Sequence, residues 1–204
     1  MKVFLLGATG KTGSLFLKMA LDRGHSVTAY VRSPEKMIVV DENLSIVKGD
    51  FLSVAQMSSA MFNHDVVVSC LGGNDNDKTT IIKELTQVIV NSMQKSSVSR
   101  IAAISTAGIH GEFSLIMNLI LKLFYKHVIN DHRLAAKIMM ASGLEYTLAR
   151  PLSLTEGSLT KEYRKTPIGV PKGGKDISRQ DLAHFLLNVI ENGEHRNETV
   201  GLAY

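Results

Sequence analysis

The sequence of 204 residues predicts an α/β fold built on a doubly wound parallel sheet. Short apolar runs alternate along the chain with longer segments of helical periodicity, which is the pattern of βαβ units. The apolar runs are nearly continuous instead of alternating with polar residues, as expected of strands that helices cover on both faces. A glycine-rich turn joins the first apolar run to the first helical segment, as in sheets that bind dinucleotides.

The bounds of the elements follow from the same patterns. Strands are expected where β-branched, aromatic and other apolar residues form short runs, at Lys2–Leu6, Ser26–Val31, Leu44–Val47, Val66–Leu71, Ile101–Ile104, Tyr146–Ala149 and Thr199–Ala203. Helices are expected where apolar residues recur every three to four positions, at Thr12–Arg23, Ser53–Phe62, Thr79–Gln94, Asn130–Ser142 and Leu182–Ile190. Ser178 is expected to cap the last helix, with Asp181 in its first turn.

The chain changes character after Pro151. Residues 152–175 contain Pro167, Pro171 and the pair Gly173-Gly174, which interrupt regular structure. We expect residues 1–204 to form one domain, in which residues 152–204 are a small substrate-side extension at the carboxyl edge of the sheet, where open α/β sheets bind ligands.

Composition limits the class of protein. The net charge is only +4 and the basic residues are scattered, so no nucleic-acid-binding stripe is expected. A single cysteine, Cys70, excludes an internal disulfide and suits a reducing compartment. The sequence starts directly in a strand, and its longest apolar stretch, Leu115–Phe124, is too short to span a bilayer. We expect a cytoplasmic protein without membrane association, as a monomer or weak homo-oligomer.

The turn Gly7-Ala8-Thr9-Gly10-Lys11-Thr12-Gly13 predicts a dinucleotide-phosphate site. Gly7 lets the chain turn sharply off the strand, Gly10 lets a pyrophosphate approach the backbone, and Gly13 lets the helix pack against the strand. The amino end of that helix offers unpaired N–H groups and the positive end of its dipole to the anion. Thr9, Lys11 and Thr12 are expected to contact the cofactor together with the three glycines.

The end of the second strand predicts which cofactor binds. NAD-specific sites place an acidic residue here for the ribose diol, but this strand ends in Arg32-Ser33. A guanidinium cannot accept a hydrogen bond from a 2′-hydroxyl, whereas its planar fork suits a 2′-phosphate. We expect NADP(H) to be preferred over NAD(H); the alternative is that Arg32 is simply solvated.

Further cofactor contacts are expected after the third and fourth strands. Asp50 can meet the adenine amino group and Phe51 can wall the adenine slot. Alternatively, Asp50 only caps the helix that starts near Ser53. The residues Leu71-Gly72-Gly73 follow the fourth strand, where small residues let the cofactor pass over the edge of the sheet.

Hydroxyl side chains end the fifth strand, beside the expected nicotinamide. Ser105 and Thr106 can bind a substrate carbonyl or the nicotinamide carboxamide, or can satisfy local backbone groups instead. Lys137 can reach the nicotinamide ribose or lie in solvent, and His132 on the same helix is more typical of a structural histidine. No metal site is expected, because the acidic loop Asn74–Asp77 lacks a histidine or glutamate at ligand spacing.

These segments together resemble the atypical short-chain dehydrogenase/reductases. The motifs that carry the resemblance are Gly7–Gly13, Val31-Arg32, Gly49-Asp50, Ser105-Thr106-Ala107, Gly143–Thr147 and Ala149-Arg150-Pro151. Within that group the chain is most similar to the NAD(P)H-binding family that includes biliverdin-IXβ reductase/flavin reductase, through Asn130–Lys137 and Ile177–Phe185. The resemblance covers essentially the whole chain and implies an NAD(P)-binding Rossmann fold.

The resemblance implies an NADPH-dependent reductase that passes hydride to a flat conjugated acceptor, such as a flavin, a quinone or a linear tetrapyrrole. It places Thr106 at the position of the family's active-site serine, with Ser105 beside it. The cofactor contacts that it implies are the glycine loop, Arg32, Asp50 with Phe51, and Leu71-Gly72-Gly73, to which we add Pro151 from the last motif.

Two departures from the family's pattern narrow the chemistry. The Tyr-x-x-x-Lys pair of ordinary short-chain dehydrogenases is missing, since Arg133 stands four residues before Lys137. An arginine does not donate a proton near neutral pH, so alcohol–ketone redox by that mechanism is disfavoured. Leu152-Ser153 replaces the Pro-His of the flavin-reductase branch, which argues against tetrapyrrole reduction and leaves the acceptor open.

Two functional hypotheses follow. The first is an NADPH-dependent oxidoreductase that reduces a planar acceptor and takes its proton from solvent or from a nearby hydroxyl. The second is a non-catalytic NADP(H) sensor that regulates a partner protein. The apolar segment Glu112–Tyr125 is expected to pack as an ordinary helix, to cover the substrate pocket or to form a self-association face. A nucleotide-sugar epimerase is disfavoured by the missing Tyr-x-x-x-Lys pair and the short C-terminal extension.

Overall fold

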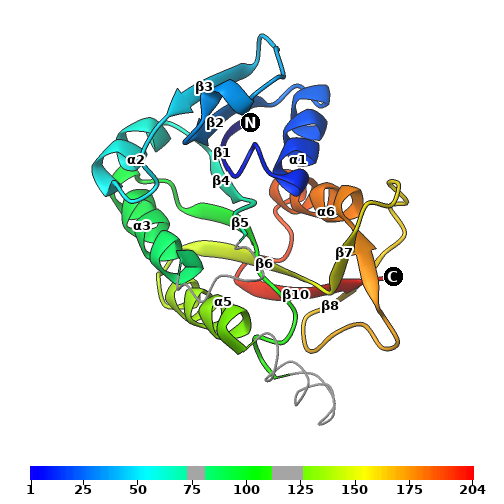
Figure 1. The fold of residues 1–204 in the computed structure, drawn as a ribbon. Coiled ribbons are helices and arrows are strands. Elements are labelled where there is room, and N and C mark those ends of the chain that lie inside the picture. The colour runs from blue at the N-terminus through cyan, green and yellow to red at the C-terminus, as the bar shows by residue number, and fades with distance from the viewer. Residues whose placement is uncertain (73–80, 112–125) are drawn as a thin grey trace.

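The computed structural model describes residues 1–72, 81–111 and 126–204. Within them, an eight-stranded sheet has the order β3-β2-β1-β4-β5-β6-β10-β8, and all neighbours are parallel except β10 and β8 (Figure 1). The strands of this sheet are β1 Lys2–Leu6, β2 Ser26–Val31, β3 Leu44–Lys48, β4 Val66–Ser69, β5 Arg100–Ile104, β6 Glu145–Pro151, β8 Arg164–Thr166 and β10 Glu198–Ala203. The order reverses between β1 and β4, as in the doubly wound Rossmann fold, so the predicted α/β class is confirmed.

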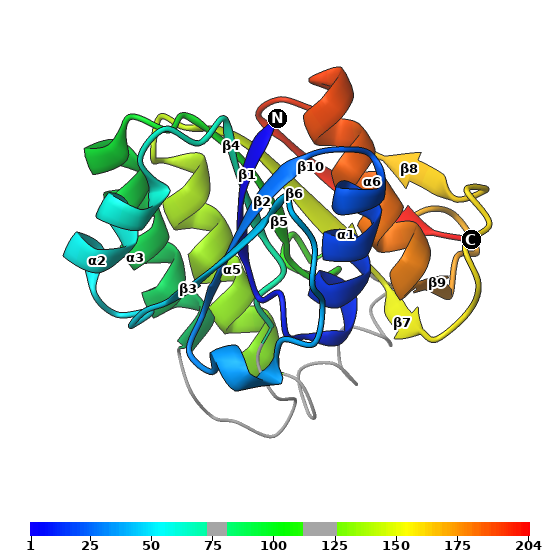
Figure 2. The same ribbon diagram turned by 90° about the horizontal axis from the view of Figure 1, so that it is seen from above.

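Helices cover both faces of the sheet. They are α1 Lys11–Asp22, α2 Val54–Met61, α3 Ile81–Ser96, α5 Lys126–Met140 and α6 Arg179–Asn192. Figure 2 shows α1 and α6 on one face and α2, α3 and α5 on the other. Each face buries its own apolar core, with Phe16 and Phe185 on the first and Phe4 and Met93 on the second. Because both faces are covered, the central strands consist mostly of apolar residues.

The predicted bounds are close to those observed. β1 and β2 coincide with their predictions, whereas β4 ends two residues early at Ser69 and β6 extends two residues further, to Pro151. α5 begins at Lys126, four residues before the predicted start. The predicted start of the third helix, Thr79, lies outside the described residues. The 3₁₀ helix η1, Pro34–Lys36, was not predicted, because three residues are too few to show a periodicity.

Residues after Pro151 contribute both to the main layers and to a second sheet. α6 packs against α1, and β10 pairs with β6 as a further parallel strand. Two short strands, β7 Ser153–Thr155 and β9 Asp176–Ser178, form a separate parallel pair.

Asp181 holds this C-terminal region together. Ser178 caps α6 by accepting a hydrogen bond from the Asp181 N–H, as predicted. The buried Asp181 carboxylate in turn accepts hydrogen bonds from the Thr160 hydroxyl at 2.8 Å, the Lys161 N–H at 2.7 Å and the Tyr204 hydroxyl at 2.6 Å. Burial by itself raises the pKa of Asp181, but these hydrogen bonds outweigh it and hold the pKa below its usual value.

The start of α1 lies against the end of β1. Gly7 adopts a φ of +83°, which confirms the sharp turn expected there. A Cβ added to Gly13 would lie 2.0 Å from the carbonyl oxygen of Gly7, so no larger residue fits between helix and strand. The predicted close-packing role of Gly13 is therefore confirmed.

We expect Gly13→Ala to lower the free energy of unfolding by about 1–3 kcal/mol, the usual range for overpacking, because backbone atoms must move apart. Gly72→Ala is the matched control: a Cβ there has no heavy atom within 4 Å, and its stability should match the wild type. Urea unfolding measures both. Equal stability of the two variants would show that the Gly7–Gly13 contact does not constrain the fold.

We expect Asp181→Asn to cost about 2 kcal/mol at pH 7, as for other hydrogen bonds to a charged group. The native pKa of Asp181 lies below that of the unfolded chain. Its stabilisation is therefore complete above the unfolded pKa of about 4 and is lost as the pH falls through the native pKa.

Denaturant unfolding at pH 7 and pH 3 tests this. The difference in free energy of unfolding between the variant and the wild type should be smaller at pH 3 than at pH 7. Asp22→Asn, at an exposed position in α1, should leave stability unchanged at both pH values. A gap of the same size at both pH values would contradict the role given to the Asp181 carboxylate.

Candidate cofactor site

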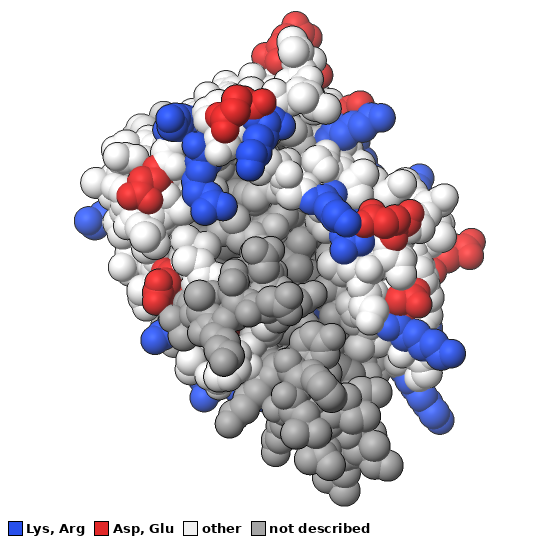
Figure 3. All heavy atoms as spheres, viewed as in Figure 1, with Lys and Arg blue, Asp and Glu red and all other residues white. Residues whose placement is uncertain are grey.

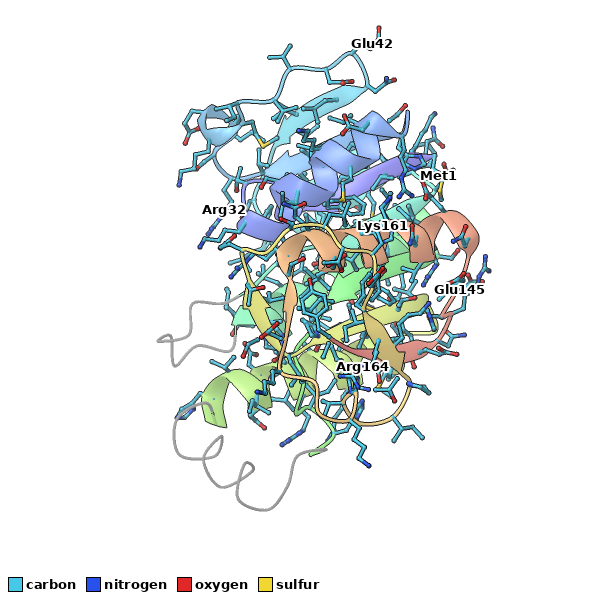
Figure 4. The ribbon with its side chains drawn as sticks, turned by 90° about the vertical axis from the view of Figure 1, so that its right-hand side faces the viewer. Met1, Arg32, Glu42, Glu145, Lys161 and Arg164 are labelled. Atoms are coloured by element: carbon cyan, nitrogen blue, oxygen red, sulfur yellow. The ribbon has the colours of Figure 1, made fainter. Side chains whose placement is uncertain are left out.

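A cavity of about 180 Å³ lies where β1, β2 and β4 end, at the carboxyl edge of the sheet. This is the point of reversal between β1 and β4, where doubly wound sheets bind their ligands. Figure 4 shows Arg32 at this edge and Met1 and Glu145 at the opposite one. The lining residues are Gly7, Thr9, Gly10, Tyr30, Val31, Arg32, Ser33, Lys36, Phe51, Cys70, Leu71 and Gly72.

The structure brings most of the predicted cofactor residues together here. Those that line the cavity are Gly7, Thr9, Gly10, Arg32, Ser33, Phe51, Leu71 and Gly72. Lys11, Thr12 and Gly13 form the first turn of α1 directly after Gly10, and Asp50 precedes Phe51 in the chain. Gly73 lies outside the described residues. These residues come from four separate parts of the sequence, which the sheet topology places side by side.

The amino end of α1 borders the cavity at Gly10. No side chain caps this helix, and its first turn contains no acidic residue. A Cβ on Gly10 would meet only the Gly7 carbonyl oxygen, at 3.2 Å, so the missing side chain leaves the cavity side open. Free N–H groups and the helix dipole at this end suit an anion such as a pyrophosphate.

Two cations stand at one side of the cavity. Arg32 is exposed and its guanidinium carbon lies 5.7 Å from the centre of the Phe51 ring. Lys36 also lines the cavity, because η1 turns the chain back after Ser33. Sequence reasoning missed Lys36; its position depends on that short helix, and its only sequence signal is a second basic residue soon after Arg32.

An aromatic platform forms the floor beside these cations. The rings of Tyr30 and Phe51 stack with centres 5.6 Å apart, and both line the cavity. A Cβ on Gly49 would lie 2.1 Å from the Tyr30 ring, so glycine at this position makes room for it. Burial, followed by the negative charge of Asp50, raises the pKa of Tyr30. Sequence reasoning missed Tyr30, because it lies within a strand whose residues were expected to face the core.

The structure separates the two roles considered for Asp50. Ser53 caps α2 by accepting a hydrogen bond from the Gln56 N–H at 3.3 Å, so Asp50 is not the helix cap. Asp50 Oδ1 accepts from the Leu52 N–H at 2.9 Å within the loop. The alternative in which Asp50 only caps the helix is therefore wrong.

Cys70 lines the cavity as a thiol and not as a thiolate. Burial raises its pKa to about 12, so it carries no charge at neutral pH. Its N–H donates to the carbonyl of Leu6 at 2.9 Å and continues the pairing of β1 with β4 beyond Ser69. Cys70 therefore helps to form the crevice as a small apolar side chain.

A second, smaller cavity lies between the sheet and helices α3 and α5. Its volume is about 30 Å³, and it is lined by Ser105 and His132 among mostly apolar residues. Leu71 lines both cavities, so the two lie next to each other. Thr106 is half-buried and lines neither of them.

Two predicted residues lie away from both cavities. Lys137 is exposed in the last turn of α5, which runs back toward the amino edge of the sheet. Pro151 is buried at the end of β6, where its carbonyl accepts a hydrogen bond from the Ala107 N–H at 3.1 Å. Arg133 donates from Nε to the Ile109 carbonyl at 2.8 Å and so fastens the loop after β5.

An ion-pair cluster joins α1 to β7 next to the glycine turn. Glu156 Oε1 lies 3.0 Å from Lys11 Nζ and 2.8 Å from an Arg179 nitrogen. The hydrogen bond with Lys11 is the main cause that lowers the pKa of Glu156, and the charge of Arg179 adds to it. Elsewhere on the described part of the face in Figure 3, acidic and basic side chains are interspersed and form no continuous basic stripe.

The described ranges contain no cluster of three or more His, Cys, Asp or Glu side chains placed to hold a metal ion. No described helix is both long enough and apolar enough to cross a membrane. The acidic loop Asn74–Asp77 and the segment Glu112–Tyr125 lie outside these ranges.

Related proteins share this architecture. The chain is 25% identical to the uncharacterized protein YwnB of Bacillus subtilis, with 97% of this chain and 96% of YwnB covered. It is 28% identical to a Rossmann-fold NAD(P)-binding family protein from Shigella flexneri, with a TM-score of 0.79 over 98% of this chain and 92% of that one. A short-chain dehydrogenase/reductase from Veillonella parvula, solved in complex with NADP, has the same fold at 19% identity, with a TM-score of 0.85 over 100% and 94%.

Two further relatives are longer proteins; this chain spans 34% of the length of one and 59% of the length of the other. The family model described as NAD(P)H-binding matches residues 7–193, from the glycine turn to the end of α6. The chain therefore belongs to the NAD(P)H-binding family, with the Rossmann fold of the short-chain dehydrogenase/reductases that it resembles.

Proposed function

We propose that the protein is an NADPH-dependent oxidoreductase that transfers hydride to a planar conjugated acceptor, such as a flavin or a quinone. Membership of the NAD(P)H-binding family supports a nicotinamide dinucleotide as the cofactor. The observation that carries the choice of NADPH is the pair of cations, Arg32 and Lys36, on the cavity wall where NAD-specific sites place a carboxylate.

The residues present fit this cofactor. The turn at Gly7 and the amino end of α1 would hold the pyrophosphate through backbone N–H groups. Arg32, Ser33 and Lys36 would hold the 2′-phosphate, and Phe51 would lie against the adenosine side. When bound, NADPH supplies a hydride from its nicotinamide ring. A similar fold solved with NADP supports this assignment.

The site supports a planar acceptor more than an alcohol or ketone. Ser105 and Thr106 directly follow β5 at the carboxyl edge and would face the nicotinamide side, together with the apolar Leu71. No Tyr-x-x-x-Lys pair is present, and Arg133 is occupied by backbone carbonyls of the loop after β5. A flat acceptor stacked on the nicotinamide needs few polar contacts, because burial and dispersion hold it.

We expect Arg32→Ala to weaken binding of NADP⁺ by about ten- to a hundredfold, the loss of one charge-assisted pair, and to change binding of NAD⁺ little. Lys36→Ala should act in the same direction. Titration calorimetry with both nucleotides measures the effect, and Lys18→Ala, an exposed position on α1, is the matched control. An equal loss for NADP⁺ and NAD⁺ would contradict recognition of the 2′-phosphate by Arg32.

The proposed reaction is tested by mixing the protein with NADPH and FMN, quinones or dichlorophenolindophenol and following the nicotinamide absorbance. We expect oxidation of NADPH by at least one of these acceptors, and a lower Michaelis constant for NADPH than for NADH. Tight binding of NADP⁺ without oxidation by any acceptor would overturn the reductase proposal and favour a non-catalytic NADP(H) sensor.

A further inference from the structure

We propose that a buried polar cluster of Ser69, Ser105 and His132 binds ordered water and delivers the proton that follows hydride transfer. This inference rests on the proposed reductase function and identifies residues through which its proton passes. The cluster lies in the smaller cavity, beside the cofactor cavity.

The three side chains are buried without a protein partner. Their exposed fractions are 6% for Ser69, 8% for Ser105 and 8% for His132. None has a side-chain hydrogen bond to another residue in the described ranges, although all three line the same cavity. The polar atoms of these side chains keep access to the cavity that they line, so water there can supply the hydrogen bonds that the protein does not.

The size of the cavity identifies water as that partner. A volume of about 30 Å³ holds one water molecule and excludes an organic ligand. A buried water needs two to four polar partners, and this cavity offers Ser69 from β4, Ser105 from β5 and His132 from α5, with Thr86 from α3 as a fourth. The rest of the lining is apolar, with residues such as Ile82.

The cluster is positioned to serve the reaction. Ser105 directly follows β5, at the carboxyl edge where the nicotinamide side of the cofactor is expected. Leu71 forms a wall of both cavities, so the water site adjoins the proposed reaction site. His132 lies on α5 and lines the smaller cavity but not the cofactor cavity, so it acts on the acceptor through the water and Ser105.

Hydride adds two electrons and one hydrogen to the acceptor, which must then gain one proton. The Ser105 hydroxyl gives its proton to the reduced acceptor and takes one from the bound water. The water takes a proton from the His132 imidazolium, leaving a neutral imidazole that solvent protonates again. Serine and water end unchanged, and the net proton comes from solvent through His132.

The groups around His132 determine how proton transfer from His132 through water to Ser105, the relay, depends on pH. Burial lowers the pKa of His132 below 6.5, and the Asp131 carboxylate offsets part of this shift. Asp131 is held in place by the N–H groups of Ile82 and Lys83, each at 3.0 Å, at the start of α3. His132 is the one titratable side chain among the described residues that line the cavity. The imidazolium therefore becomes rarer as the pH rises through the acid range.

Steady-state rates with an active acceptor, measured from pH 5 to pH 8, test the relay. In the wild type, kcat should fall as the pH rises through the pKa of His132. In His132→Gln this limb should disappear, with a loss of about a hundredfold at pH 5.5, the lower end of the range for general acid catalysis. His127→Gln, an exposed position on the same helix, should keep the wild-type profile.

Nuclear magnetic resonance of the histidine rings, with NADP⁺ bound, gives a readout that does not depend on turnover. His132 should titrate below 6.5, and Ser105→Ala should shift its ring signals while leaving those of His127 unchanged. Thermal melts establish that each variant is folded, and His132→Asn replaces His132→Gln if the latter is not.

The outcomes separate the two proposals. If the wild type reduces an acceptor and His132→Gln keeps the acid limb, the relay is overturned and the reductase function stands. An ordinary pKa for His132, or ring signals unaffected by Ser105→Ala, also overturns the relay alone. If the wild type reduces no acceptor, the reductase function fails and the relay fails with it.

Discussion

The close contact between the backbones of Gly7 and Gly13 fixes the position of α1 against the sheet, and the packing of α1 and the site at its amino end depend on it. It brings the first turn of α1 against the end of β1, at a distance that no side chain could share. The amino end of the helix therefore lies at the crevice between β1 and β4, where its free N–H groups suit an anion. The same contact sets the height of α1 over the sheet, and with it the packing of Phe16 in the core shared with α6.

The cofactor site combines rigid and solvated parts. Backbone groups and the stacked rings of Tyr30 and Phe51 are held by the strands, so they are in place before a ligand arrives. Arg32 and Lys36 stand at the exposed rim, where water screens their charges. In the proposed mode of binding, affinity for the dinucleotide core would come from preorganised backbone, and discrimination at the ribose from a few charge-assisted hydrogen bonds.

The nicotinamide side is built on a different principle. Ordinary short-chain dehydrogenases use a tyrosine and a lysine one helical turn apart. Here α5 carries Arg133, which donates a hydrogen bond to the loop after β5, and Lys137, which is exposed in the last turn of the helix. The polar side chains that line the smaller cavity beside β5 carry hydroxyls and one imidazole. This lining is consistent with the proposed acceptor, which would need a hydride and a single proton but no strong base from the protein.

The fold class, most strands and helices, and the glycine turn could be predicted from the sequence, because each depends on residues that are neighbours in the chain. The period of an apolar run or the spacing of three glycines can be read locally. Arg32, Ser33 and Phe51 could also be found from their distance along the chain, since the carboxyl ends of parallel strands meet at one edge.

Which side chains line the same cavity could not be predicted from the sequence, because it depends on how distant segments pack together. Lys36 lines the cavity because the three-residue helix η1 turns the chain back toward it. Tyr30 lies beside Phe51 because β2 packs next to the loop that follows β3. Ser69, Ser105 and His132 lie more than 25 residues apart in sequence and meet because β4, β5 and α5 are packed together. Lys137 and His132 lie on one helix, yet of these two only His132 lines one of the two cavities described above. The rotation of α5 about its own axis determines which of its side chains lines the cavity. This rotation is set by packing of α5 against α3 and the sheet, and not by the local sequence pattern.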